Sequence, residues 1–256
     1  MKSLNIFLSL YLIFSMHQEL LADSLPDYKR ENNINEQIIN FVFDSEIIKL
    51  NSELEREFNL VVDKESFSKY SVLLLHGRGL YPNEPKVMNP LKLFFQDIGY
   101  SVYSPQLPVL SKGETYNDYQ KIFKYSSHRI QSSIEFINEK NIIIVAHSCG
   151  AHMLTSWLAE FSDKRIVGLV LLGAGAVDRN EKVIHEINYE LLDVPIINIY
   201  GEFDHGSVKK NSMMFKKNYL SKNDYSANIE VEGANHDYED TVNYVVEYLK
   251  EWLKPL

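Results

Sequence analysis

The stretch NIIIVAHSCGAHMLTSWLAE, residues 141–160, decides the fold. It begins as a continuous apolar run, which is typical of a strand buried on both faces of a sheet, and it continues with helical periodicity. Ser148 lies where the two patterns meet. A serine between a buried strand and a helix, with small residues two positions before and two positions after it, fits a nucleophile elbow. Ala146 and Gly150 are those small residues, although glycine is usual at the first position.

The alternation of apolar strand and amphipathic helix extends from residue 71 to the end of the chain. Continuous apolar strands joined by helices indicate a mostly parallel sheet covered on both faces. Two earlier segments, 38–50 and 57–63, are rich in β-branched and aromatic residues, and we expect them to form an antiparallel hairpin at the edge of this sheet. The other expected strands are 71–75, 100–108, 165–176, 194–204 and 226–236, and the expected helices are 86–98, 117–139, 150–161, 207–220 and 238–253.

Composition is that of an ordinary globular protein. The chain has 256 residues, of which 45% are hydrophobic and 24% are charged, and this fits one large α/β domain. A domain of this size buries a substantial core without disulfides or metals. The net charge of −9 argues against a nucleic-acid surface, which needs lysine and arginine to neutralise phosphates. Cys149 is the only cysteine, so an internal disulfide is impossible.

The N-terminus has the pattern of a secretory signal peptide. Lys2 precedes a mostly apolar run over residues 4–16, and Ala22 supplies a small residue for cleavage. The apolar run is too short for an ordinary membrane span, although it could also be a buried helix. We expect a signal peptide over 1–22 and a periplasmic or secreted protein without a stable membrane span. A loose lead-in over 23–37 and a single domain over 38–256 would follow.

Three residue types of a hydrolytic triad follow the expected strands. In parallel sheets the ligand site lies beyond the carboxyl ends of the strands, and Ser148, Asp204 and His236 occupy such positions in the order Ser, Asp, His. Serine is a poor nucleophile at neutral pH, so it needs a base, and the base needs an orienting carboxylate. We therefore expect Ser148 to be the nucleophile, His236 the general base and Asp204 the orienting acid.

Acyl transfer also needs two N–H groups to stabilise the oxyanion of the tetrahedral intermediate. The residue after the nucleophile supplies one of them, which is the main chain of Cys149 here. The other comes from the loop after the first parallel strand, residues 76–79, whose glycines let the backbone fold over the site. Arg78 N–H is our first choice for this donor and Gly79 N–H the second.

Two residues compete for the roles of acid and base. Asp178 follows another strand at the same sheet edge and is the alternative acid, and Asp204 could instead cap the helix that follows it. His205 neighbours Asp204 and is the alternative base. It lies before its helix rather than after the last strand, so His236 is preferred.

Three further histidines could suggest a metal site. His147 and His152 are five residues apart, a spacing that puts them on different faces of a helix, and His76 would be the third ligand. No carboxylate or cysteine spacing supports zinc, so we expect no metal and assign these histidines to polar packing around the elbow. Cys149 is not expected to be a nucleophile, because its side chain points into the fold if Ser148 points out.

The motifs LLLHGRG, VAHSCGAH, YGEFD and GANHD resemble those of the α/β-hydrolase superfamily over roughly residues 60–256. The resemblance implies an α/β-hydrolase fold and the triad described above. Residues 76–110 also resemble an exported, uncharacterised bacterial family of this kind, which implies no substrate. Only the 17 residues 177–193 separate the two strands between which such hydrolases insert a lid, so no large lid domain is expected. The loop 105–117 is the other candidate cover.

These observations predict a serine hydrolase that cleaves carboxylic esters or thioesters by acyl transfer to Ser148, with a small-molecule substrate and no cofactor. The substrate and the oligomeric state are left open by the sequence. One alternative is a serine peptidase, which uses the same machinery. The other is an exported binding or assembly protein that keeps the fold without turnover, and the presence of all three triad residues argues against it.

Overall fold

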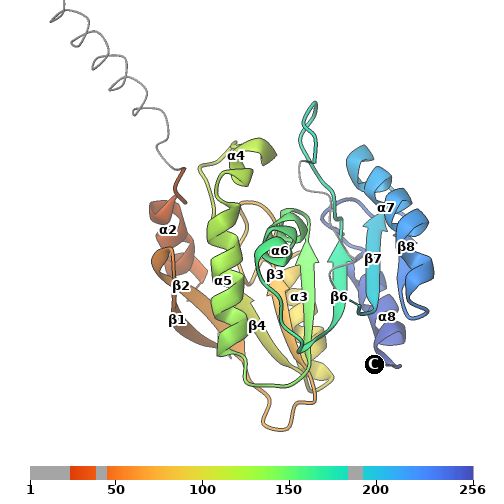
Figure 1. Cartoon of the computed structure of the whole chain (residues 1–256), viewed down its shortest axis with the longest axis horizontal. Helices are drawn as coiled ribbons and strands as arrows, with labels where there is room; N and C mark the ends of the chain where they lie inside the picture. The colour runs from red at the N-terminus through yellow and green to blue at the C-terminus, as the bar shows by residue number, and fades with distance from the viewer. Residues whose placement is uncertain (1–23, 39–44, 184–192, 256) are drawn as a thin grey trace, which may run out of the picture.

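The computed structural model describes residues 24–38, 45–183 and 193–255. They form an eight-stranded sheet in the order β1-β2-β4-β3-β5-β6-β7-β8 (Figure 1). The strands are β1 Glu46–Ser52, β2 Glu55–Asp63, β3 Ser71–Leu75, β4 Ser101–Pro105, β5 Ile142–His147, β6 Ile166–Leu172, β7 Ile196–Gly201 and β8 Ala227–Val231. The β1–β2 and β2–β4 pairs are antiparallel, and the other neighbours are parallel. The mostly parallel sheet and its antiparallel edge hairpin are therefore confirmed.

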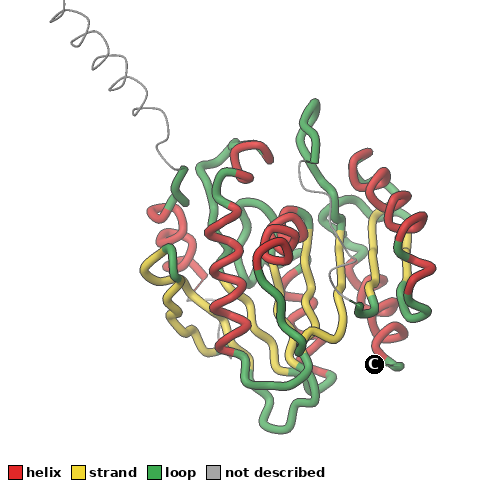
Figure 2. Tube along the Cα trace, in the orientation of Figure 1, coloured by secondary structure: helices red, strands yellow, loops and turns green. Residues whose placement is uncertain are grey.

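Helices cover both faces of the sheet (Figure 2). They are α2 Tyr28–Ile38, α3 Met88–Asp97, α4 Tyr116–Gln120, α5 Phe123–Phe136, α6 Cys149–Glu160, α7 Gly206–Asn218 and α8 Val242–Leu253, with a short 3₁₀ helix η2 Leu220–Lys222. Side chains of α4, α5, α6 and α7 belong to the core on one face, and those of α3 and α8 belong to the core on the other. The single helix expected over 117–139 is divided into α4 and α5, which are separated by Lys121 and Ile122.

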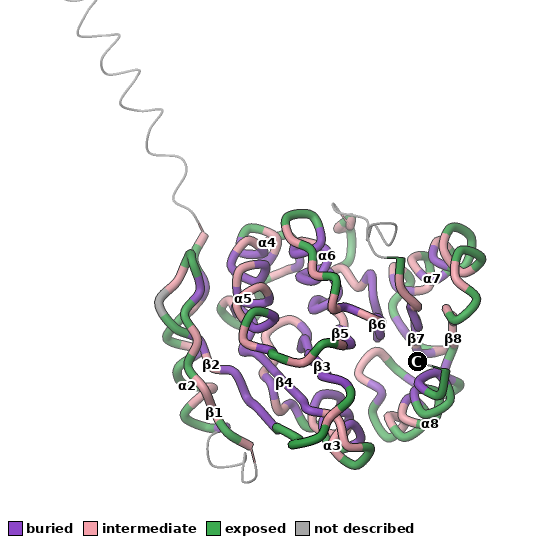
Figure 3. The backbone as a smooth tube through the Cα atoms, turned by 60° about the horizontal axis from the view of Figure 1, so that its bottom comes forward, coloured by how far each residue is buried: buried purple, intermediate pink, exposed green. Residues whose placement is uncertain are grey.

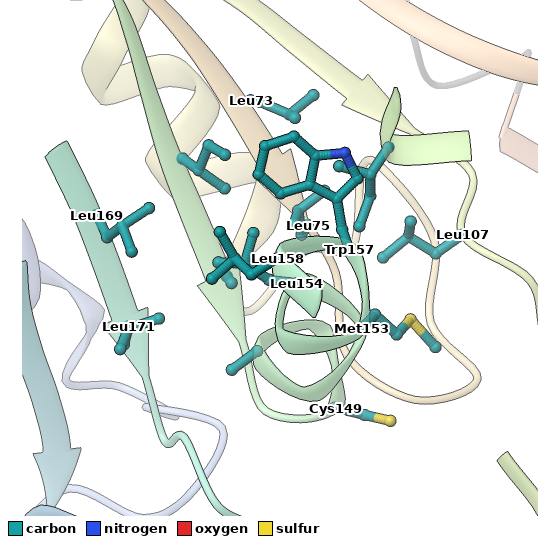
Figure 4. Packing of buried hydrophobic residues seen from close by; sticks show 14 of the residues in the cluster. Leu73, Leu75, Leu107, Cys149, Met153, Leu154, Trp157, Leu158, Leu169 and Leu171 are labelled. Carbon is teal, nitrogen blue, oxygen red and sulfur yellow. The ribbon is translucent and has the colours of Figure 1, made fainter. Parts of the chain in front are cut away.

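Strand side chains alternate between the two cores, which explains the continuous apolar runs in the sequence. In β3, Leu73 and Leu75 face the core under α6, whereas Val72 and Leu74 face the core under α3 and α8, and all four are fully buried. Figure 3 shows the inner strands as buried along their length. Figure 4 shows Trp157 of α6 beside Leu73 and Leu75 of β3, with Leu154 and Leu158 of α6 directed toward the β6 side.

Residues 28–38 form helix α2, so the expectation of a loose lead-in is wrong for this segment. Helix α2 is held against the domain by Arg129 of α5, whose side chain is fully buried. Its guanidinium donates to Glu31 of α2 at 3.0 Å, to Glu55 of β2 at 2.6 and 2.7 Å, and to the carbonyl of Gln106 at 2.8 Å. Glu31 and Arg129 are 98 residues apart, so no local sequence pattern indicates that this polar segment is anchored.

Residues 1–22, the expected signal peptide, lie outside the described residues, as do residues 39–44 of the first expected strand. Among the helices that the structure describes, none is both long enough and apolar enough to cross a membrane.

Substitution of Arg129 tests the ion-pair network that holds α2. Arg129→Ala leaves two buried carboxylates without their cation, and we expect it to lower the free energy of unfolding by about 3–5 kcal/mol. The control is Lys250→Ala, which removes the exposed ion pair with Glu247 and is expected to give no measurable change. Urea unfolding followed by circular dichroism measures both variants. Equal stability of the two variants would contradict the role given to Arg129.

Candidate active site

The carboxyl ends of the parallel strands meet at one edge of the sheet, where α4 and the loop after β6 rise in Figure 1. Ser148 lies at this edge between β5 and α6, with φ 53° and ψ −119°. Such a backbone conformation is costly for a residue other than glycine, by about 1–3 kcal/mol, and persists only where its surroundings fix it. Here Ser148 N–H donates to Leu172 O at 2.8 Å, and Ala151 N–H donates to Ser148 O at 3.1 Å. The serine is therefore in the sharp turn that the sequence predicts.

Gly150 is needed because the first turn of α6 presses against the end of β3. A Cβ atom at this position would lie 2.5 Å from Leu75 O and 2.8 Å from His76 O, closer than real contacts allow. Ala146 is fully buried at the end of β5, so alanine fits at the other small-residue position. The two positions thus differ, since only the second excludes a methyl group.

Ser148, His236 and Asp204 form a hydrogen-bonded chain. His236 Nε2 lies 2.7 Å from Ser148 Oγ, and His236 Nδ1 lies 2.7 Å from Asp204 Oδ1. A carboxylate only accepts hydrogen bonds, so Nδ1 carries the proton and donates it to Asp204. Nε2 is then free to accept the hydroxyl proton of Ser148. The structure brings together the three residues that the sequence analysis selected as nucleophile, base and acid.

The environment of Asp204 keeps it ionised. Burial alone raises the pKa of Asp204, but hydrogen bonds from His236 and from the N–H groups of His205 (2.7 Å) and Gly201 (3.4 Å) outweigh burial and place this pKa below its ordinary value. The carboxylate is therefore charged at neutral pH and can stabilise a protonated imidazole at His236. This arrangement makes Asp204 the partner of the histidine rather than a side-chain cap of α7.

Two glycines let the loops converge on the triad. Gly173 has φ 57°, and a Cβ atom there would lie 2.8 Å from His236 Cε1. At Gly201 a Cβ atom would lie 2.4 Å from Ala234 O, in the loop that carries His236. The sequence analysis gave neither glycine a role. Their position immediately after apolar strands was the available signal for this role.

His147 supports the loop that carries His236. Its Nε2–H donates to His236 O at 3.1 Å, and the two rings lie 5.4 Å apart between centroids. Burial, together with the nearby His236, lowers the pKa of His147 to about 4, so this ring is neutral. Tyr238 anchors the same loop through its hydroxyl, which donates to Ile199 O at 2.8 Å. His147 therefore packs at the elbow, as the sequence analysis proposed.

The other two buried histidines also bond to backbone groups. His76 Nδ1–H donates to Gly77 O at 2.8 Å, and His76 Nε2 accepts from Leu107 N–H at 3.0 Å. His152 Nε2–H donates to Ala176 O at 3.1 Å. Burial lowers the pKa of each ring to about 4. The packing interpretation of both histidines is supported by these contacts.

Asp178, the alternative acid, belongs to the wall of the site instead. It forms an ion pair with Arg78 of the loop after β3, with Arg78 Nη2 3.0 Å from Asp178 Oδ1, and it accepts from Tyr116 N–H at 2.8 Å. The hydrogen bond from Arg78 holds the pKa of Asp178 below its ordinary value. Asp178 thus fixes the side chain of Arg78, and the histidine contacts Asp204.

Cys149 and His205 take positions that fit the preferred assignments. The side chain of Cys149 is buried in the core beside Met153 (Figure 4), and burial raises the pKa of its thiol to about 12. A protonated, buried thiol is a poor nucleophile. His205 precedes α7 with its ring 4.7 Å from the His236 ring, and the contact with Ser148 is made by His236.

A cleft of about 420 Å³ opens above Ser148. Its lining combines apolar groups, such as Leu80 and Val177, with charged ones, such as Arg78 and Asp178. The complete lining consists of Gly77, Arg78, Leu80, Tyr116, His147, Ser148, Cys149, Ala176, Val177, Asp178, Arg179, His205, His236 and Asp237. Residues 184–192, which belong to the segment where a lid would be inserted, lie outside the described residues.

Comparison with solved structures places the chain in a known fold. A lidless α/β serine hydrolase from Xanthomonas campestris is 10% identical, with a TM-score of 0.60 over 83% of this chain and 95% of that one. The esterase Pf2001 from Pyrococcus furiosus is 15% identical, with a TM-score of 0.61 over 85% of this chain and 92% of that one. A bromoperoxidase from Bacillus anthracis is 12% identical, with a TM-score of 0.59 over 82% of this chain and 100% of that one.

The chain therefore has the α/β-hydrolase fold, with an antiparallel edge hairpin added to the parallel sheet. Neither the models of known protein families nor the curated protein sequences contain a match to this chain.

Substitution of Gly150 tests the close packing beneath the elbow. Gly150→Ala places a methyl group against the Leu75 and His76 carbonyls, and we expect it to lower the free energy of unfolding by about 1–3 kcal/mol. The control is Gly206→Ala at the start of α7, where a Cβ atom would meet nothing within 4 Å and stability should hold. Thermal unfolding compares the two variants. A Gly150→Ala variant as stable as Gly206→Ala would contradict the packing argument.

Proposed function

We propose that this protein is a serine hydrolase that cleaves carboxylic ester or thioester bonds by acyl transfer to Ser148. The observation that carries the proposal is the chain of two 2.7 Å hydrogen bonds joining Ser148, His236 and Asp204, with the serine on a strained turn at the carboxyl edge of the sheet. This arrangement supplies a nucleophile, a base within reach of its proton, and a carboxylate that orients the base.

In the proposed mechanism His236 Nε2 takes the hydroxyl proton as Ser148 Oγ attacks the carbonyl carbon of the substrate. Asp204 stabilises the imidazolium that forms. His236 then returns the proton to the leaving alcohol or thiol, and the acyl group remains on Ser148. In the second half of the reaction His236 takes a proton from water, whose oxygen attacks the acyl carbon. The bond between this carbon and Ser148 Oγ then breaks, His236 gives its proton to Oγ, and the acid leaves.

The oxyanion is assigned to the backbone N–H groups of Arg78 and Cys149. Cys149 is the first residue of α6, where amide hydrogens and the helix dipole favour negative charge. The loop of Arg78 is fixed from two sides. Asp178 holds its guanidinium, and Arg30 of α2 donates to Gly79 O at 3.0 Å. The position of the Arg78 amide thus depends on contacts with two distant segments.

The cleft supports a small substrate. The Arg78–Asp178 ion pair occupies part of its wall, and a long acyl chain laid against that pair would strip water from two charges. We therefore infer that short acyl groups are preferred, and the secretory pattern of residues 1–22 leads us to propose a periplasmic or secreted site of action.

A fluorophosphonate probe tests the role of Ser148, because this probe labels activated serines. The wild-type protein should be labelled and should hydrolyse p-nitrophenyl acetate. Ser148→Ala should abolish labelling and lower the hydrolysis rate by at least about 10³-fold. Cys149→Ala is the matched control, since it removes the neighbouring side chain and keeps the backbone N–H, and it should remain labelled. Labelling that persists in Ser148→Ala would rule out this serine as the nucleophile.

Arg30 tests how far activity depends on the loop of Arg78. Arg30→Ala removes the hydrogen bonds to Gly79 O and Leu110 O, and we expect kcat to fall about 10- to 100-fold because the amide of Arg78 shifts. Guanidinium ion added to the assay should restore part of the rate. Lys29→Ala, at an exposed neighbouring position, is the control. Equal rates for the two variants would contradict the proposal that Arg30 of α2 positions the loop of Arg78.

A further inference from the structure

We propose that Asp204, His205 and His236 form a binding site for a divalent transition metal ion of the zinc class, and that the bound ion switches the triad off. The binding site is independent of the proposed function, whereas the inhibitory effect rests on it. One ligand atom from each of the three residues lies within 4.8 Å of the other two. Within this group of residues, His236 Nδ1 and Asp204 Oδ1 are 2.7 Å apart.

The donor set fits zinc. Two imidazole nitrogens and one carboxylate oxygen are ligands that zinc commonly uses, with water in the fourth position of the tetrahedron. Asp204 is held in place by the backbone N–H groups of His205 and Gly201, which is the kind of outer support that orients a ligating carboxylate. The carboxylate is ionised, as metal binding requires.

His205 distinguishes this group from the other histidines around the site. His76, His147 and His152 are buried and bond to backbone carbonyls. His205 is exposed and lines the cleft, and within the described residues its ring has no hydrogen-bond partner. Its backbone lies at the start of α7, and its ring is 4.7 Å from the ring of His236 between centroids.

Metal binding at His236 Nδ1 changes which nitrogen of this ring carries the proton. The ion replaces the proton between Nδ1 and Asp204, and the neutral ring keeps its single N–H by carrying it on Nε2. Nε2–H then donates to Ser148 Oγ, so it no longer accepts the serine proton, and the base is lost. No atom is oxidised or reduced. When a chelator removes the ion, the ring again carries its proton on Nδ1, and Nε2 is again free to accept the serine proton.

Metal binding is measured first, on the full-length Ser148→Ala protein, which keeps all three ligands and has no turnover. Titration with Co²⁺ should give the visible absorption of a four-coordinate site at one ion per chain, and Zn²⁺ should displace the Co²⁺. Adding His205→Gln should weaken Zn²⁺ binding by at least about ten-fold. The matched control is His128→Gln, because His128 lies 3.4 Å from Glu53 and 3.5 Å from Glu160 and would report adventitious surface binding.

Inhibition is measured second, on the protein with Ser148 intact. Zn²⁺ should block fluorophosphonate labelling, and EDTA should restore it. Each variant's labelling rate is compared with its own rate without metal. On this scale, His205→Gln should need at least about ten-fold more Zn²⁺ for the same fractional loss of labelling rate. Absence of stoichiometric binding, or equal affinity with and without His205, would overturn the metal site. Binding that depends on His205 in a protein without labelling would uphold the site and refute the proposed function instead. Binding without any effect on labelling would overturn the switch.

Discussion

The contact between Gly150 and the end of β3 sets the position of everything else at the site. Because no Cβ intervenes, the first turn of α6 rests directly on the Leu75 and His76 carbonyls, and the chain must reverse sharply at Ser148 to reach it. The unfavourable backbone angles of that serine are held by the burial of α6, where Trp157 is fully covered by the core. The position of Ser148 at the edge of the sheet is thus a consequence of how tightly α6 packs on β3.

The same sheet edge gathers the remaining groups. Strands β5, β6, β7 and β8 are adjacent and parallel, so the loops after them meet at one edge although Ser148 and His236 are 88 residues apart. Glycine at 173 leaves room for the imidazole itself, and glycine at 201 lets the Asp204 loop touch the loop before His236. The two 2.7 Å hydrogen bonds therefore join three loops, which follow β5, β7 and β8, so the adjacent strands of the sheet set the distances between Ser148, His236 and Asp204.

This origin explains what could be predicted from the sequence. Strands β5 and β7 are almost entirely buried and appear as continuous apolar runs, so their ends, and hence Ser148 and Asp204, could be located without a structure. The edge strand β8 is only partly buried, and His236 could be located because it lies between that strand and the last helix. What the sequence did not indicate depends on partners distant in the chain. Helix α2 is polar and is stabilised by an arginine 98 residues away. The approach of His205 to His236 is likewise set by the packing of two loops.

Helix α2 also changes where the functional unit begins. The sequence analysis started the domain at residue 38 and treated the preceding segment as an appendage. In the structure Glu31 is buried and accepts hydrogen bonds from Arg129 and from Val109 N–H, while Arg30 bonds to the carbonyls of Gly79 and Leu110. A helix that contacts both loops beside the cleft is part of the support of the site. Removal of this segment would therefore displace the loop of Arg78 more than the central sheet, because Arg30 bonds directly to the carbonyls of Gly79 and Leu110.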